Sequence, residues 1–88
     1  MNFEFTGVLL RSAGNRSSVP IPAATLGDAL TELTSQLPQM GRILLDNTGQ
    51  LRRAHRLFLN GELVPNPDRT MVLSESDRIE FLTAIAGG

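Results

Sequence analysis

TLGDALTELTSQLP, residues 25–38, is the stretch whose pattern decides the fold. Thr25 is a residue type that caps helix starts, and Asp28, three positions later, completes a capping box and suits the positive end of the helix dipole. Four leucines follow at helical spacings and share one face: Leu26, Leu30, Leu33 and Leu37. Pro38 ends this helix, and a further helical turn is expected over residues 41–45. An apolar face of this kind predicts a helix that packs against a sheet.

The residues before this helix predict two strands. Residues 2–11 form the first, because apolar and polar side chains alternate from Asn2 onward. Residues 12–16 are a cluster of turn-forming types. Residues 18–21 form a second, short strand, which belongs at a sheet edge because Pro20 has no amide hydrogen to donate to a neighbour.

The residues after the helix predict the rest of the sheet. Residues 56–60 form a strand, and Asn60-Gly61 is a tight-hairpin pair that leads into residues 62–64. Residues 78–83 form the last strand, which we expect to lie parallel to the first. The chain therefore predicts an α+β fold, a mixed sheet of four or five strands on one main helix.

Composition limits what the chain does. It has 88 residues, a net charge of −1, eight arginines and no lysine. Only Arg52, Arg53 and Arg56 cluster, so a nucleic-acid-binding face is not expected. These arginines either form a solvated surface or meet an acidic partner, and the sequence leaves both open.

The N-terminus does not read as a secretion signal, and no apolar stretch is long enough to span a membrane, so a cytoplasmic location is expected.

Catalytic and metal-binding roles find no support in the sequence. There is no cysteine, which excludes thiolate catalysis and thiolate metal sites. His55 is the single histidine, without a carboxylate pair at ligand spacing, and we expect it to be exposed at a strand edge. The chain is thus not expected to be an enzyme or to bind a metal or cofactor of its own.

The end of the chain carries the functional hypothesis. It reads Thr83-Ala84-Ile85-Ala86-Gly87-Gly88, and a terminal glycine pair occurs by chance in roughly 0.5% of chains. Six extended residues reach about 20 Å, and glycine lets a backbone approach another surface closely. We expect residues 1–83 to form the domain and residues 84–88 a flexible tail that enters the active site of a partner.

Three stretches carry a family resemblance: residues 25–30 at the helix start, residues 57–62 at the hairpin, and residues 77–82 leading into the tail. With the terminal Gly-Gly, they resemble the ubiquitin-like β-grasp fold and, more narrowly, the MoaD/ThiS sulfur carriers. Residues 50–62 and 84–88 look most similar to CysO-like carriers that feed sulfide to a cysteine synthase. The chain departs from the family at Ser76, where glycine is common, and its tail lacks the prolines of the molybdopterin branch.

The resemblance implies a chemistry for Gly88. An E1-like enzyme of the MoeB/ThiF type would use ATP to adenylate its carboxylate, and a sulfur donor would convert the adenylate into a thiocarboxylate. A cysteine synthase, or a thiosugar or thiazole synthase, would then accept the sulfur. With no cysteine in the chain, the terminal carboxylate is the only anchor for sulfur. ATP and other cofactors would belong to the partners.

Strand alternation indicates a recognition face. Leu57 and Leu59 share one phase, as do Ile79 and Phe81, which leaves Phe58 and Leu82 on the opposite face. We expect this pair to form a partner-binding patch beside the tail. The resemblance implies the same location, because ubiquitin and related carriers bind through this sheet face.

Two other functions remain open at this stage. One is a ubiquitin-like modifier that forms isopeptide bonds through Gly88; without lysine it does not build lysine-linked chains on itself. The other is a β-grasp interaction domain whose tail is incidental. Fold alone does not choose among them.

Overall fold

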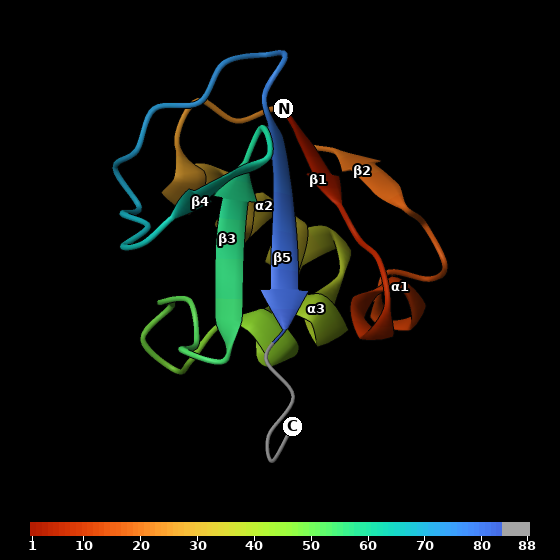
Figure 1. Cartoon of the computed structure of the whole chain (residues 1–88). Helices are drawn as coiled ribbons and strands as arrows, with labels where there is room; N and C mark the ends of the chain where they lie inside the picture. Colours follow the sequence, from red (N-terminus) through yellow and green to blue (C-terminus); the bar gives the residue numbers. More distant parts are fainter. Residues whose placement is uncertain (84–88) are drawn as a thin grey trace.

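Helix α2 (Leu26–Gln36) packs across one face of a sheet in the computed structural model, which describes residues 1–83 (Figure 1). Its start is capped as the sequence predicts: Thr25 Oγ1 accepts a hydrogen bond from the Asp28 amide at 3.2 Å. Four buried residues of this helix form the face turned toward the sheet: Leu26, Ala29, Leu30 and Leu33. Gly27 is buried against Arg69 instead.

Pro38 does more than end this helix. It is the first residue of a second helix, α3 (Pro38–Leu44), so the turn expected at residues 41–45 begins three residues earlier. Proline suits this position because the first residues of a helix do not need their amide hydrogens. Met40, Gly41 and Leu44 are buried, which makes α3 part of the helix layer beside α2.

The sheet has five strands: β1 (Asn2–Glu4), β2 (Ser18–Pro20), β3 (His55–Leu59), β4 (Glu62–Val64) and β5 (Arg78–Thr83). Their order is β2-β1-β5-β3-β4. Strand β2 therefore lies at an edge, as its proline requires, and β1 runs parallel to β5, as predicted. All other pairs are antiparallel. Because β5 is the central strand, the described part of the chain ends in the middle of the sheet, at Thr83 (Figure 1).

The first strand is shorter than the sequence pattern indicates. It ends at Glu4, and the rest of the segment forms a short helix, α1 (Val8–Ser12). Gly7 separates the two with φ 58°, a conformation that side-chain-bearing residues rarely adopt. The prediction of one strand over residues 2–11 was wrong because the apolar residues from position 8 onward follow a helical turn.

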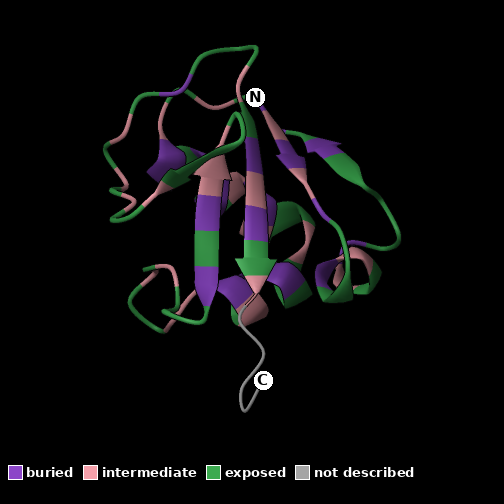
Figure 2. Ribbon diagram, viewed as in Figure 1, coloured by how far each residue is buried: buried purple, intermediate pink, exposed green. Residues whose placement is uncertain are grey.

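The sheet separates its two faces cleanly (Figure 2). Phe3, Ile79 and Phe81 point into the core, and the rings of Phe3, Phe5 and Phe81 stack with centroids 5.7–6.3 Å apart. Their neighbours along the strands point away from the helices. This five-stranded mixed sheet with one main helix is the β-grasp fold.

Candidate functional site

Phe58 and Leu82 lie on the face of the sheet that no helix covers. Phe58 pairs with Glu80, and Leu82 pairs with Arg56, so the two apolar side chains are diagonal neighbours on adjacent strands. Leu82 is 60% exposed, whereas Phe58 is only partly exposed. The expected pair is therefore unequal: Leu82 projects, and Phe58 lies lower against the sheet.

The surface between these residues is hollowed. A depression of about 260 Å³ is lined by Phe58, Leu82, Thr6, Gly61, Glu80 and Phe81. A second, of about 210 Å³, is also lined by Leu82 and reaches Val8 and Thr83. Leu82 therefore borders both shallow hollows, which together extend from the β3–β4 turn at Gly61 to Thr83 at the end of β5.

Two further apolar residues extend this face, and the sequence analysis missed both. Leu63 lies directly opposite Phe58 on β4 and is 49% exposed. A signal for it was present, because the two-residue Asn60-Gly61 turn fixes this pairing. Val8 is 67% exposed. Its place on this face could not be predicted from the sequence, because its segment was expected to continue as a strand. We call Val8, Phe58, Leu63 and Leu82 the apolar face.

The base of the predicted tail lies at the end of β5. Thr83, the last described residue, pairs with His55 at the start of β3. The five predicted tail residues lie outside the described part of the chain: Ala84, Ile85, Ala86, Gly87 and Gly88. The described part of the chain thus ends at Thr83, next to Leu82 of the apolar face, and the predicted tail stays a prediction.

His55 is buried, which corrects the expectation of an exposed histidine. Strand β3 lies between β5 and β4 and is not an edge strand, and His55 shares its inward face with Leu57. The ring is only 6% exposed and has a partner at each nitrogen, the Ile43 carbonyl oxygen at 2.8 Å and Thr83 Oγ1 at 3.1 Å. Two partners are what a buried imidazole needs.

The clustered arginines lie at the same end of the molecule. Arg52, Arg53 and Arg56 are exposed and line a polar hollow of about 500 Å³ next to His55. Arg56 donates to the Arg53 carbonyl oxygen at 3.4 Å.

Within residues 1–83, no helix has the length and apolar content to cross a bilayer, and no group of three potential metal ligands is close enough together to hold a metal ion.

A sequence comparison decides the family. The ThiS family model matches residues 4–88, which is nearly the whole chain and includes its terminal Gly-Gly. The chain belongs to the ThiS family. Proteins of the ThiS family are ubiquitin-like sulfur carriers of the β-grasp fold and are not themselves catalysts. No curated protein matches the sequence.

Solved structures agree with this fold at low sequence identity. SAMP1 from Haloferax volcanii has a TM-score of 0.83 and 23% identity, with 100% of this ThiS-family chain and 98% of that chain covered. CysO in the BexX/CysO complex of Amycolatopsis orientalis has a TM-score of 0.83 and 22% identity. The match covers 99% of this chain and 98% of that chain. CysO of Mycobacterium tuberculosis has a TM-score of 0.80 and 22% identity. The match covers 96% of this chain and 98% of that chain.

These structural neighbours are of two kinds, and neither kind is more similar to this chain than the other. Small archaeal modifier proteins and CysO proteins match with nearly the same score and identity. The chain is therefore a ThiS-family sulfur carrier or a small ubiquitin-like modifier, and the BexX/CysO complex is an example of a partner bound to such a fold.

Proposed function

We propose that this protein is a sulfur carrier whose Gly88 carboxylate becomes a thiocarboxylate and then donates sulfide in a biosynthetic reaction. The observation that carries the proposal is that the family match extends through Gly88, in a chain without cysteine. A carrier without a thiol has to hold sulfur on its terminal carboxyl group.

The chemistry takes place on a partner. A carboxylate is a poor acyl donor, so an E1-like enzyme first attaches AMP from ATP to Gly88 and releases pyrophosphate. Hydrosulfide then attacks the acyl carbon and displaces AMP, which leaves the thiocarboxylate. A sulfur-accepting enzyme of the cysteine, thiosugar or thiazole synthase type consumes the sulfur, and hydrolysis of the spent acyl group regenerates the carboxylate. The chain itself supplies position rather than catalysis, as group carriers do.

The apolar face gives the partner a place to hold the domain. Leu82 projects from β5 two residues before Ala84, where the predicted tail starts. An enzyme that covers Phe58 and Leu82 is thereby in contact with the strand that leads to Gly88. Exposed apolar residues gathered in this way are typical of interaction sites.

Intact mass spectrometry tests the proposal. The protein is incubated with ATP, sulfide and its adenylating enzyme, and conversion of carboxylate to thiocarboxylate adds about 16 Da because sulfur replaces one oxygen. A chain that lacks Gly88 is the control and should gain no mass. A full-length chain that stays at its original mass, although the enzyme activates another carrier, would refute the proposal.

A modifier function is the second candidate, favoured by the similarity to small archaeal modifier proteins. It uses the same Gly88 adenylate but transfers the acyl group to a lysine of another protein. The absence of lysine in this chain limits such conjugates to one copy at each acceptor site. Conjugates in cell extracts that disappear when Gly88 is deleted, without any thiocarboxylate, would favour this function over the carrier.

A further inference from the structure

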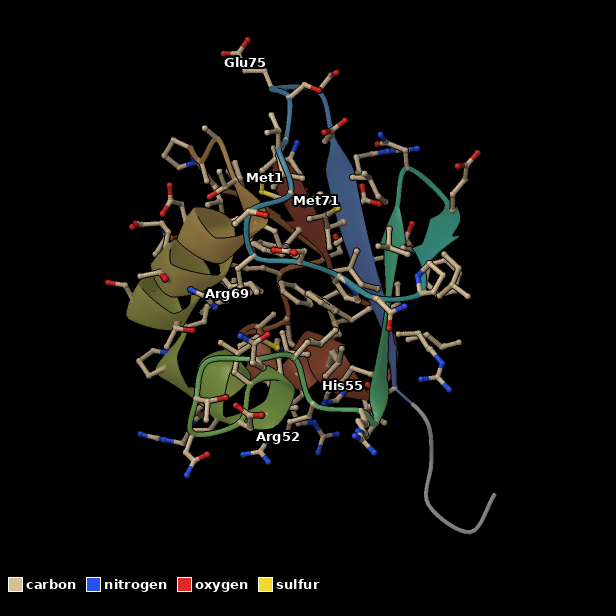
Figure 3. The ribbon with its side chains drawn as sticks, turned by 90° about the vertical axis from the view of Figure 1, so that its left-hand side faces the viewer. Met1, Arg52, His55, Arg69, Met71 and Glu75 are labelled. Atoms are coloured by element: carbon tan, nitrogen blue, oxygen red, sulfur yellow. The ribbon has the colours of Figure 1, made fainter. Side chains whose placement is uncertain are left out.

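His55 is the one buried polar or charged side chain within residues 1–83. It occupies the first position of β3, and Figure 3 shows it between the lower end of that strand and the helix layer. Burial of an imidazole ring costs free energy unless its nitrogens are paired, whereas an aliphatic residue fills such a position without this requirement. The two partners of the ring therefore call for an explanation.

The partners determine which nitrogen carries the hydrogen. The Ile43 carbonyl oxygen only accepts, so Nε2 donates to it across 2.8 Å. In the neutral ring, Nδ1 is then an acceptor, and the Thr83 hydroxyl donates to it across 3.1 Å. His55 thus connects the last turn of α3 with the final described residue of β5.

This contact holds Thr83 by its side chain as well as by its backbone. Thr83 pairs with His55 at the very end of the sheet, where strand residues open most easily. The branched Thr83 side chain has few rotamers, so a bond at its hydroxyl also restricts the backbone that carries it. Ile43 supports the ring from the opposite side, so the Thr83 side chain is held through His55 by α3 as well as by β3.

We propose that His55 is a positioning residue that acts through Thr83 to orient the predicted tail for adenylation. The inference rests on the proposed function, because it concerns the reaction at Gly88. Five residues follow Thr83, the last of them Gly88, and they reach at most about 18 Å. A change of direction at their base displaces the far end the most. Holding the base therefore raises the fraction of bound chains whose carboxylate meets ATP.

The proposal predicts a specific kinetic change. The apolar face holds the domain on its partner. Thr83 borders the hollow beside Leu82, but the bond between its hydroxyl and the His55 ring lies on the inward side of the sheet, and a valine at this position keeps the shape of the side chain. Loss of the contact should therefore lower kcat for adenylation and leave KM for the carrier nearly unchanged. A single hydrogen bond of this kind corresponds to a loss of about five- to tenfold.

Thr83→Val is the decisive variant, because it removes the hydroxyl and retains the shape of the side chain. Thr83→Ser keeps the hydroxyl and should restore most of kcat. Thr34→Val is the matched control: Thr34 is also partly buried and its hydroxyl also donates to a protein acceptor, the Leu30 carbonyl oxygen at 2.9 Å, but it lies on α2. ATP–pyrophosphate exchange at varied carrier concentration gives kcat and KM for each protein.

Nitrogen NMR of the His55 ring reports the contact directly. The native ring should show Nε2 protonated and Nδ1 unprotonated with a hydrogen bond, and Thr83→Val should shift the Nδ1 resonance while Thr34→Val leaves it in place. Unchanged kcat in Thr83→Val, once the Nδ1 shift has shown the contact to be lost, would overturn the proposal. An equal fall in kcat for Thr34→Val would also overturn it, because general destabilisation would then be the cause. If the unaltered chain is not adenylated at all, the proposed function itself fails.

Discussion

Gly41 shows how closely the two helices of the helix layer approach each other. A methyl group added at this position would lie 2.5 Å from Cγ2 and 2.7 Å from Oγ1 of Thr34. Thr34 has little freedom to move away, because its hydroxyl is bonded to the Leu30 carbonyl oxygen and its branched side chain has few rotamers. The contact between α2 and α3 therefore depends on the absence of a side chain at Gly41.

Gly41→Ala should destabilise the protein, although alanine favours helices more than glycine does. The overlap with Thr34 outweighs the gain in helix propensity, and the expected loss in unfolding free energy is about 1–3 kcal/mol. Urea unfolding measures it. Adding Thr34→Ala to Gly41→Ala should recover most of the loss, because it removes both overlapping atoms. A double variant as unstable as Gly41→Ala would show that the contact with Thr34 is not the cause.

At the scale of elements, a polar network joins the β3–β4 turn to the start of β5. Asn60 adopts φ 52°, which its hairpin position requires, and its side chain donates to Asp77 Oδ1 at 2.9 Å and accepts from the Arg78 amide at 2.9 Å. Asp77 Oδ2 also accepts from the Ser74 amide at 2.7 Å. The network aligns β5 with β3 at the end of the sheet opposite the tail.

This network makes stability depend on pH. The hydrogen bond from the Ser74 amide, followed by that from the Asn60 side chain, lowers the pKa of the Asp77 carboxyl from its ordinary value of 3.8. A carboxyl whose pKa is lower in the folded state stabilises the protein above its unfolded pKa. That contribution is lost as the pH falls below 3.8 and through the folded-state pKa.

Asp77→Ala should therefore unfold at a lower urea concentration at pH 7 and lose less additional stability on acidification than the unaltered protein. Urea midpoints measured from neutral pH to about pH 2 test both effects. Some acid sensitivity should remain, because hydrogen bonds from Thr48 and Thr70 similarly lower the pKa values of Asp46 and Asp68. Glu75→Ala, the loss of an exposed carboxylate in the same loop, is the matched control. An identical pH dependence in Asp77→Ala and the unaltered protein would contradict this account.

At the scale of the whole molecule, the helices cover one face of the sheet and leave the other uncovered within residues 1–83. The apolar face lies on the uncovered side, and the described part of the central strand, β5, ends beside it (Figure 1). We expect one partner surface to contact both the apolar face and the predicted tail. The apolar face and the contact between His55 and Thr83 should consequently affect different kinetic constants.

Leu82→Ser should raise KM for the carrier in adenylation by about tenfold and leave kcat nearly unchanged, because it removes a contact made equally before and during the reaction. Adding Phe58→Ser should raise KM further at some cost in stability, since Phe58 is partly buried. Val72→Ser is the control, because Val72 is 78% exposed but lies outside the apolar face. Unchanged KM in the double variant would show that the activating enzyme does not bind here.

Much of this architecture is readable from local patterns. Residue types at short spacings are enough to predict four features: the cap at Thr25, the leucine face of α2, the Asn60-Gly61 turn and the span of β5. The alternation along β3 and β5 also distinguishes inward from outward residues, so it places Leu82 correctly on the uncovered face. The sequence analysis did not predict the short helix α1. The periodicity changes at Gly7, and a single glycine fits many conformations, so it does not indicate which structure follows.

The sequence by itself determined the plan of a mixed sheet on one main helix, the absence of any thiol and the Gly-Gly at its end, because these depend on composition and on periodicities within one element; the resemblance to known carriers then gave the β-grasp fold. Only the tertiary structure decided that His55 is buried, that its two partners are Ile43 and Thr83, and that Val8 lies beside Leu82. These facts depend on which strands become neighbours and on what each helix covers. The two contacts of His55 join residues 12 and 28 positions apart, and no local pattern specifies them.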